Sequence, residues 1–98
     1  MSTRLTDQDI EQRLKTATGW SRDGHLIRKQ FAFASFPDGL AFLVRLGFEC
    51  EAQDHHPDIT VDYKRVTLGY WTHSEGGLTD KDFVGAQTAD RIAANFAR

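Results

Sequence analysis

At residues 51–57 the chain reads EAQDHHP, which sets two carboxylates and two imidazoles within seven positions and closes with a proline. Imidazole has an ordinary pKa of about 6.5, so it can take or give a proton near neutral pH, and a neighbouring carboxylate can orient it. Pro57 disfavours helical geometry at the preceding residue, so we expect a helix to end here and His56 to precede the next strand. The stretch predicts a proton-transfer site at a junction between a helix and a strand.

The segment before this junction predicts a long apolar helix. Ser35 is a suitable N-cap, and Pro37 is tolerated in a first turn. Apolar residues then recur at helical spacing in a main stripe of Phe36, Leu40, Leu43, Val44, Gly47 and Cys50, which Phe42, Leu46 and Phe48 widen. This width exceeds the need of one sheet face and indicates a second partner surface. If the helix persists far enough, Glu51 and His55 share one of its faces.

The first third of the chain predicts a short helix and a hairpin. Thr6 is followed by acidic residues, as at a capped helix start, and Gly19 is placed to end the helix. Asp23-Gly24 is a hairpin-type turn between a brief strand at Trp20 and a longer one over residues 25–33. The longer strand alternates between apolar and polar side chains, which fits a sheet covered on one face only.

Two strands and a last helix are expected after the junction. Residues 59–63 and 65–72 are rich in β-branched and aromatic side chains, and the second of these strands delivers His73. Thr79 with Asp82 three positions later resembles a capping box, which would open a helix that runs to about residue 96. The expected fold is α+β in the order α-β-β-α-β-β-α, one domain over residues 1–98 with helices covering one face of a four-stranded antiparallel sheet.

Composition excludes several classes of protein. The 98 residues carry a net charge of −2 without a cluster of basic residues, so direct nucleic-acid binding is not expected. Cys50 is the one cysteine, which rules out an internal disulfide and a cysteine-based zinc finger, and on an apolar helix face we expect it to be structural. The sequence shows no signal peptide and no long apolar run, so we expect a cytoplasmic protein that does not bind membranes.

The run from Glu51 to Asp82 resembles the signature of the pterin-4a-carbinolamine dehydratases. The matching residues are Glu51, Asp54-His55-His56-Pro57, Tyr63, Val66, Thr72-His73, Gly77-Leu78-Thr79 and Asp82. A His-His-Pro triplet alone is weak, but the same triplet followed at that family's spacing by Thr-His and Gly-Leu-Thr-x-x-Asp is specific. The upstream helix, hairpin and helix also occur in the family's order.

This resemblance implies dehydration of a 4a-hydroxytetrahydropterin to a quinonoid dihydropterin, a step in pterin recycling that needs no cofactor and no metal. Catalytic roles fall on His55, His56 and His73, with His56 as the principal base and the other two assisting at the departing hydroxyl. The expected substrate-binding residues are Glu51, Asp54, Pro57 and Asp82. Glu51 and Asp54 would orient imidazoles or hold polar groups of the pterin. Asp82 would either accept a hydrogen bond from His73 or cap its own helix.

Some positions depart from the family's pattern. Ile59 stands where many members carry tryptophan, and Val61-Asp62 replaces a usual Asn-Val pair, which bears on the pocket lining and on strand packing. Gly85 replaces a usual leucine and Ala89 a common isoleucine, so we expect thinner packing of the last helix.

Other interpretations remain open from the sequence. Glu51 and the two adjacent histidines contain enough donors for a facial metal site, although neighbouring side chains on a regular element point in different directions. His25 has no partner motif and is expected to be structural. The family also includes coactivators and assembly factors, which leaves a protein-interaction role as the alternative. In either case we expect a homodimer or homotetramer, because the second helix is apolar over a wide arc.

Overall fold

In a computed structural model that describes residues 3–96, helices and strands follow one another in the order predicted from the sequence. The elements are α1 (Asp7–Leu14), β1 (Ser21–Asp23), β2 (Leu26–Ala32), α2 (Phe36–Gln53), β3 (Asp58–Asp62), β4 (Arg65–Tyr70) and α3 (Asp80–Ala93), with short 3-10 helices η1 (His73–Glu75) and η2 (Ala94–Phe96). The expected α+β fold is confirmed. Among these described residues, no helix is both long and apolar enough to cross a membrane.

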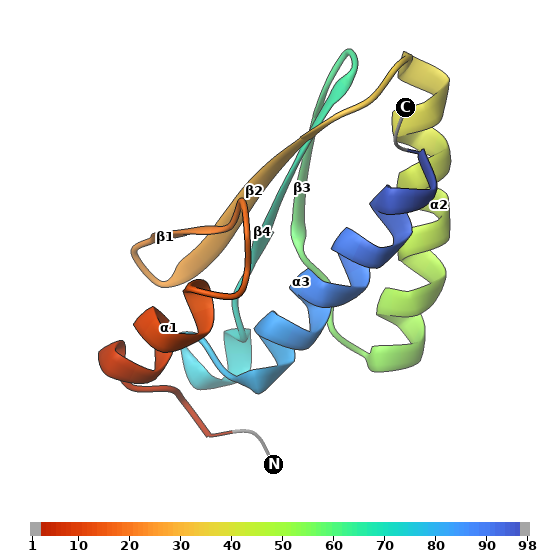
Figure 1. The fold of residues 1–98 in the computed structure, drawn as a ribbon. Coiled ribbons are helices and arrows are strands. Elements are labelled where there is room, and N and C mark those ends of the chain that lie inside the picture. The colour runs from red at the N-terminus through yellow and green to blue at the C-terminus, as the bar shows by residue number, and fades with distance from the viewer. Residues whose placement is uncertain (1–2, 97–98) are drawn as a thin grey trace.

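The four strands form one antiparallel sheet in the order β1-β2-β4-β3. Ile27 of β2 pairs with Tyr70 of β4, and Ile59 of β3 pairs with Leu68 on the other side of β4. The central strand β4 is therefore buried over most of its length, whereas every residue of the edge strand β3 is exposed. Helices α2 and α3 lie side by side against one face of the sheet (Figure 1).

Each of the three α-helices begins at the cap that the sequence predicted. Thr6 and Asp9 form a capping box at α1, and the Ser35 hydroxyl accepts the backbone N–H of Asp38 at the start of α2. Thr79 and Asp82 form a second capping box at α3. Side-chain oxygens thus satisfy backbone donors that the first turn of a helix leaves unpaired.

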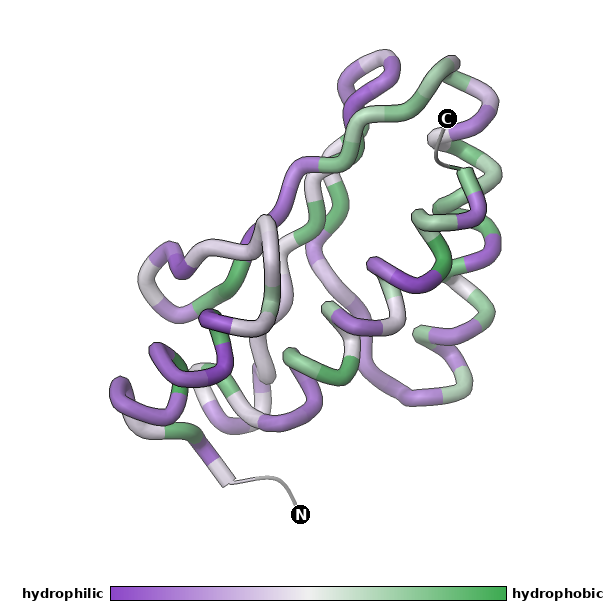
Figure 2. The backbone as a smooth tube through the Cα atoms, viewed as in Figure 1, coloured by the Kyte–Doolittle hydropathy of each residue, from purple (hydrophilic) through white to green (hydrophobic). Residues whose placement is uncertain are grey.

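The face that α2 presents to the sheet differs from the predicted main stripe. Gly39, Phe42, Leu46 and Cys50 are the residues of α2 that the core buries. Phe36, Leu40, Val44 and Phe48 lie on the outer side and are exposed, at 41% or more. We call these four residues the outer stripe of α2. Both rows follow helical spacing, so α2 carries apolar residues on its inner and its outer side. Figure 2 shows hydrophobic residues along α2, whereas α1 is mostly hydrophilic.

The expected thinning of the last helix at Gly85 does not occur. A Cβ atom at Gly85 would lie 2.5 Å from Cε1 of Tyr70, so the Tyr70 ring already fills the space beside this glycine. Tyr70 is only 1% exposed, and Ala89 is fully buried one turn further along α3. The small residues of α3 let the helix lie close to a large aromatic side chain on β4.

Candidate functional site

The chain turns sharply between α2 and β3, and this turn sets the direction of the two adjacent histidines. Helix α2 ends at Gln53, and Asp54 follows it in the left-handed conformation, with φ 52° and ψ 44°. A left-handed residue after a helix reverses the chain, and aspartate tolerates that conformation better than most residues. The helix therefore stops before the two histidines, so Glu51 and His55 do not share a helix face as the sequence had suggested.

His55 points inward and is held by a buried carboxylate. Its Nε2 lies 2.7 Å from Oδ1 of Asp82, a residue with no exposed surface. The other oxygen of Asp82, Oδ2, accepts hydrogen bonds from the Thr72 hydroxyl at 2.8 Å and from the backbone N–H of Thr79 at 2.9 Å. Asp82 therefore caps its helix and holds a histidine at the same time. The helix cap was one of the two roles considered for Asp82, and the histidine it holds is His55 in place of the His73 named in the other.

His56 points outward and pairs with a different carboxylate. Its Nε2 lies 2.6 Å from Oε1 of Glu51. In a neutral imidazole, a carboxylate at Nε2 selects the tautomer whose Nε2–H donates, which leaves the lone pair on Nδ1. The same reasoning applies to His55 and Asp82. Each of the two histidines is thus oriented by an acid, with Nδ1 as the nitrogen that can accept a proton.

A hollow of about 410 Å³ lies against these side chains. It is lined by Asp54, His55, His56, Thr72, His73, Ser74 and Lys81. Four of the seven predicted site residues, Asp54 and the three histidines, therefore meet at one cavity. Its volume falls in the range of small-molecule sites, about 300–1,000 Å³.

The other three predicted residues do not line the hollow. Asp82 lies behind His55 and Glu51 beside His56, as their hydrogen bonds show. Pro57 is half-buried and leads directly into β3. Ile59, which departs from the family's usual tryptophan, also lies outside the lining, on the exposed edge strand.

Packing behind His55 involves a buried tyrosine and the cysteine. The rings of His55 and Tyr70 are stacked with centroids 5.8 Å apart. The Tyr70 hydroxyl lies 4.0 Å from Sγ of Cys50. Burial raises the pKa of the Cys50 thiol above its ordinary value and likewise raises the pKa of the Tyr70 hydroxyl. Both groups are therefore protonated at neutral pH and act as packing partners.

The model for the pterin 4 alpha carbinolamine dehydratase family matches residues 3–92 of this chain. The chain belongs to this family. A protein from Roseiflexus sp. (strain RS-1), assigned provisionally as a pterin-4-alpha-carbinolamine dehydratase, is 51% identical over 92 residues, which cover 94% of this chain and 99% of that protein.

Solved structures give the same fold. A transcriptional coactivator/pterin dehydratase from Brucella melitensis superimposes with a TM-score of 0.90 at 31% identity, covering 93% of this chain and 99% of that one. A pterin dehydratase-like protein described as a RuBisCO assembly factor in the alpha-carboxysome reaches a TM-score of 0.62 at 24% identity. It covers 76% of this chain and 86% of its own, and at that identity the likeness concerns the fold alone.

Several residues around the dehydratase-family signature were given no role from the sequence. Thr72 donates to Asp82, and Ser74 and Lys81 line the hollow. Thr72 adjoins His73 in the Thr-His pair, so the motif itself contained the signal for it. Lys81 lies between the two acids of a capping turn, a context that gives no hint of a cavity.

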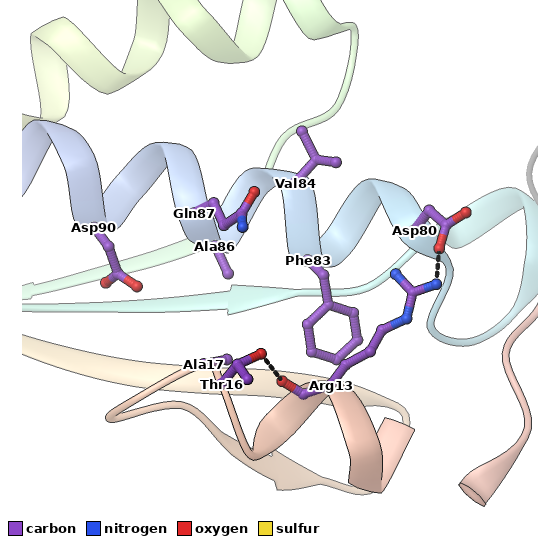
Figure 3. A pocket seen from close by; sticks show the side chains of 9 residues that line it. All are labelled: Arg13, Thr16, Ala17, Asp80, Phe83, Val84, Ala86, Gln87 and Asp90. Carbon is purple, nitrogen blue, oxygen red and sulfur yellow. Dashed lines mark hydrogen bonds and ion pairs between the residues drawn. The ribbon is translucent and has the colours of Figure 1, made fainter. Parts of the chain in front are cut away.

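A second hollow, of about 250 Å³, lies between α1 and α3 (Figure 3). The Phe83 ring lines it, and an ion pair between Arg13 and Asp80 crosses one end. No histidine or cysteine of residues 3–96 lines this hollow. The three histidines of the family signature line the first hollow, which is the candidate active site.

Proposed function

We propose that this protein dehydrates 4a-hydroxytetrahydropterins to quinonoid dihydropterins and so serves pterin recycling. The observation that carries the proposal is the meeting of His55, His56 and His73 at one hollow, with a carboxylate bonded to each of the first two. Membership of the dehydratase family supports the same reaction class.

The reaction needs two proton transfers and no change of oxidation state. A base removes the proton on N5, the C4a–N5 double bond forms, and the C4a–O bond breaks. An acid protonates the departing hydroxyl, which leaves as water. We assign the first transfer to His56 and the second to His55 and His73. This division is supported by exposure, because the side chain of His56 is 55% exposed to solvent and that of His55 only 10%.

The carboxylates have distinct parts in the proposal. Glu51 and Asp82 orient the two imidazoles and stabilise them when they are protonated, as a carboxylate does for a catalytic histidine. Asp54 lines the hollow next to the histidines and would accept hydrogen bonds from the amino and ring N–H groups of a pterin. Pro57 fixes the chain direction directly after His56.

A direct assay tests the proposal. The 4a-carbinolamine is generated by a hydroxylase, and its decay is followed spectroscopically with and without the purified protein. We expect faster decay, which the His55→Ala/His56→Ala double variant should reduce to the uncatalysed rate. Equal decay with and without the wild-type protein would overturn the proposal.

Metal independence is part of the same proposal, since neither proton transfer calls for a Lewis acid. His55 and His56 also bond to different carboxylates on different sides of the turn, which is not the convergent arrangement of a facial metal site. Activity should survive prolonged treatment with EDTA. Loss of turnover that zinc restores would require another role for both histidines.

A homo-oligomer is also proposed, on the strength of exposed apolar surface. The outer stripe of α2 adds four large apolar side chains to the molecular surface, and Ile59 and Val61 are exposed on β3. Exposed apolar side chains gathered along one helix mark a protein interface, and an edge strand invites pairing with another chain. We infer that copies of this chain associate through these surfaces as dimers or tetramers.

The same surface supports the alternative function of a protein-interaction factor. The Brucella relative is named both a coactivator and a dehydratase. The two functions are separated by substituting the outer stripe and the histidines independently. An interaction function would be lost with Val44→Glu and kept with His56→Ala.

A further inference from the structure

His73 is held in a different way from the other two histidines. Its ring stacks on the indole of Trp71, with centroids 3.8 Å apart and 24° between the planes. The residue between them, Thr72, is extended, with φ −100° and ψ 104°. Side chains two residues apart in an extended chain emerge on the same side, which is why the two rings meet.

Trp71 is in turn held by the β1–β2 hairpin. His25 lies in the turn of that hairpin and packs against Trp71 at 4.4 Å between centroids, with 79° between the planes. The pairing of Ile27 with Tyr70 brings the turn to this end of β4. Three rings, His25, Trp71 and His73, thus run from the hairpin to the edge of the hollow in edge-to-face and stacked contacts, which are the favoured aromatic geometries.

The backbone at His73 gives little restraint of its own. His73 begins the three-residue helix η1, and Gly76 follows that helix in the left-handed conformation, with φ 65°. The side chain of His73 is exposed, so few neighbours limit its rotamers. Thr72, by comparison, is fixed by its bonds to Asp82 and Thr79. An imidazole on such a turn needs an outside contact to keep one orientation.

We infer that Trp71 is a positioning residue, which holds the His73 imidazole at the hollow by face-to-face stacking, and that His25 fixes Trp71 from the other side. This inference rests on the proposed dehydratase function. Trp71 would act through His73 and without touching substrate. Its removal would allow His73 to leave the position from which it protonates the departing hydroxyl.

The stack itself is tested by NMR, without reference to activity. The C–H resonances of the His73 ring are assigned with a His73→Gln variant. An indole face at this distance shifts them upfield, and Trp71→Leu should remove the shift, whereas Trp71→Phe should keep part of it. His25→Ala should reduce the shift. Wild-type resonances at the positions of an exposed histidine would overturn the inference.

Kinetics then test the function of the stack. Misplacing a catalytic group by about 1 Å costs up to about 10²-fold in rate, so we expect Trp71→Leu to lower kcat roughly 10-fold, with KM changed less than about 2-fold. Trp71→Phe, which keeps an aromatic face, should recover most of the loss. The two variants have similar hydrophobic volume, so a fold defect would affect both.

A double-mutant cycle decides whether Trp71 acts through His73. Trp71→Leu should have no further effect on kcat in a His73→Ala background, because the group it positions is already gone. The same fold loss in both backgrounds would overturn the inference and leave the proposed function standing. No turnover by wild-type protein would instead overturn the proposed function, and with it this role of Trp71.

Discussion

His55 and His56 are neighbours in sequence with opposite surroundings. His55 bonds to a fully buried aspartate and stacks on Tyr70, whereas His56 bonds to the exposed Glu51 at the surface. Both histidines line the hollow, but the side chain of His56 is the more exposed of the two, at 55% against 10%. This difference between two adjacent side chains supports the proposal, first made from the family resemblance, that His56 is the principal base.

The first prediction compares the three histidines as alanine variants. A positioned general base contributes about 10²- to 10⁴-fold to rate, so His56→Ala should lower kcat more than His55→Ala or His73→Ala. Pterin affinity should fall less than kcat, because the lost groups act mainly on charge that develops in the transition state. Steady-state kinetics and a pterin titration measure both quantities.

The His55→Ala/His56→Ala double variant shows whether the two histidines act together. Water or a neighbouring imidazole can partly replace one lost group, so single variants should keep some turnover and the losses should not add. If all three single variants lost kcat equally and only slightly, His56 would not be the principal base.

At the level of helices and strands, the close approach of α3 to β4 depends on the contact between Gly85 and the Tyr70 ring. We predict that Gly85→Ala destabilises the fold by about 1–3 kcal/mol, since the added methyl group meets the Tyr70 ring at 2.5 Å. Gly47, in the exposed part of α2, is the matched control, because a methyl group added there would meet no atom within 4 Å. Gly47→Ala should stabilise by about 0.5–1 kcal/mol through helix propensity.

The mechanism of that destabilisation has its own check. Tyr70→Leu shortens the side chain that the new methyl group meets, so urea unfolding should show that Gly85→Ala costs less in the Tyr70→Leu background. An unchanged cost would place the conflict elsewhere in α3.

The order and type of the elements followed from the sequence because caps, turns and periodicity all agreed. The orientation of α2 did not, because Phe42 and Leu46 belong to one apolar row and Val44 and Phe48 to another, and hydrophobicity alone does not say which row meets the sheet. In the folded protein the row that contains Gly39 packs against the sheet, because the absence of a side chain at Gly39 lets Val66 of β4 approach α2 closely.

From the sequence we could predict that the candidate site residues lie near one another better than we could predict which of them are in contact. Helical spacing suggested that Glu51 faces His55. The left-handed conformation of Asp54 instead ends the helix and turns the chain, so Glu51 forms its hydrogen bond with His56. Aspartate tolerates the left-handed conformation but adopts it in only a minority of cases, so the sequence does not reveal it at Asp54. The bond between His55 and Asp82 joins residues 27 positions apart and depends on how α3 packs against the turn between α2 and β3.

For the molecule as a whole, alkaline pH should weaken the fold. The ordinary pKa values of Cys50 and Tyr70 are 9.0 and 10.0, and burial raises both in the folded state. The folded protein then binds more protons than the unfolded chain above about pH 9, so the free energy of unfolding is at its full value below that pH and falls as pH rises. Urea unfolding from pH 8 to pH 10.5 should show this decline.

A variant identifies the groups responsible for the pH dependence. Tyr70→Phe removes one of the two buried acids and should flatten the decline at the alkaline end. If the decline were equally steep in Tyr70→Phe, the tyrosine would have no part in it.

Assembly state is the second property of the whole molecule that can be predicted. Light scattering at micromolar concentration should give the mass of a dimer or tetramer. Val44→Glu in the outer stripe of α2 should lower that mass, because it places a charge in a desolvated interface. Val84→Glu is the control, since Val84 is similarly exposed on α3 but lies outside the stripe. A monomer mass for the wild type would refute the oligomer.

The Asp82 carboxylate both caps the start of α3 and orients His55, so these two features form and break together. The Thr79 amide donates to the same carboxylate that holds the histidine, so local fraying of the first turn would release His55 as well. Hydrogen exchange at the Thr79 amide should therefore report the fraction of molecules in which this end of the candidate site is open, on the timescale of minutes to hours. Slow exchange at that one amide would mean that the histidine is already in position before substrate arrives, and that binding a pterin requires little ordering of the protein.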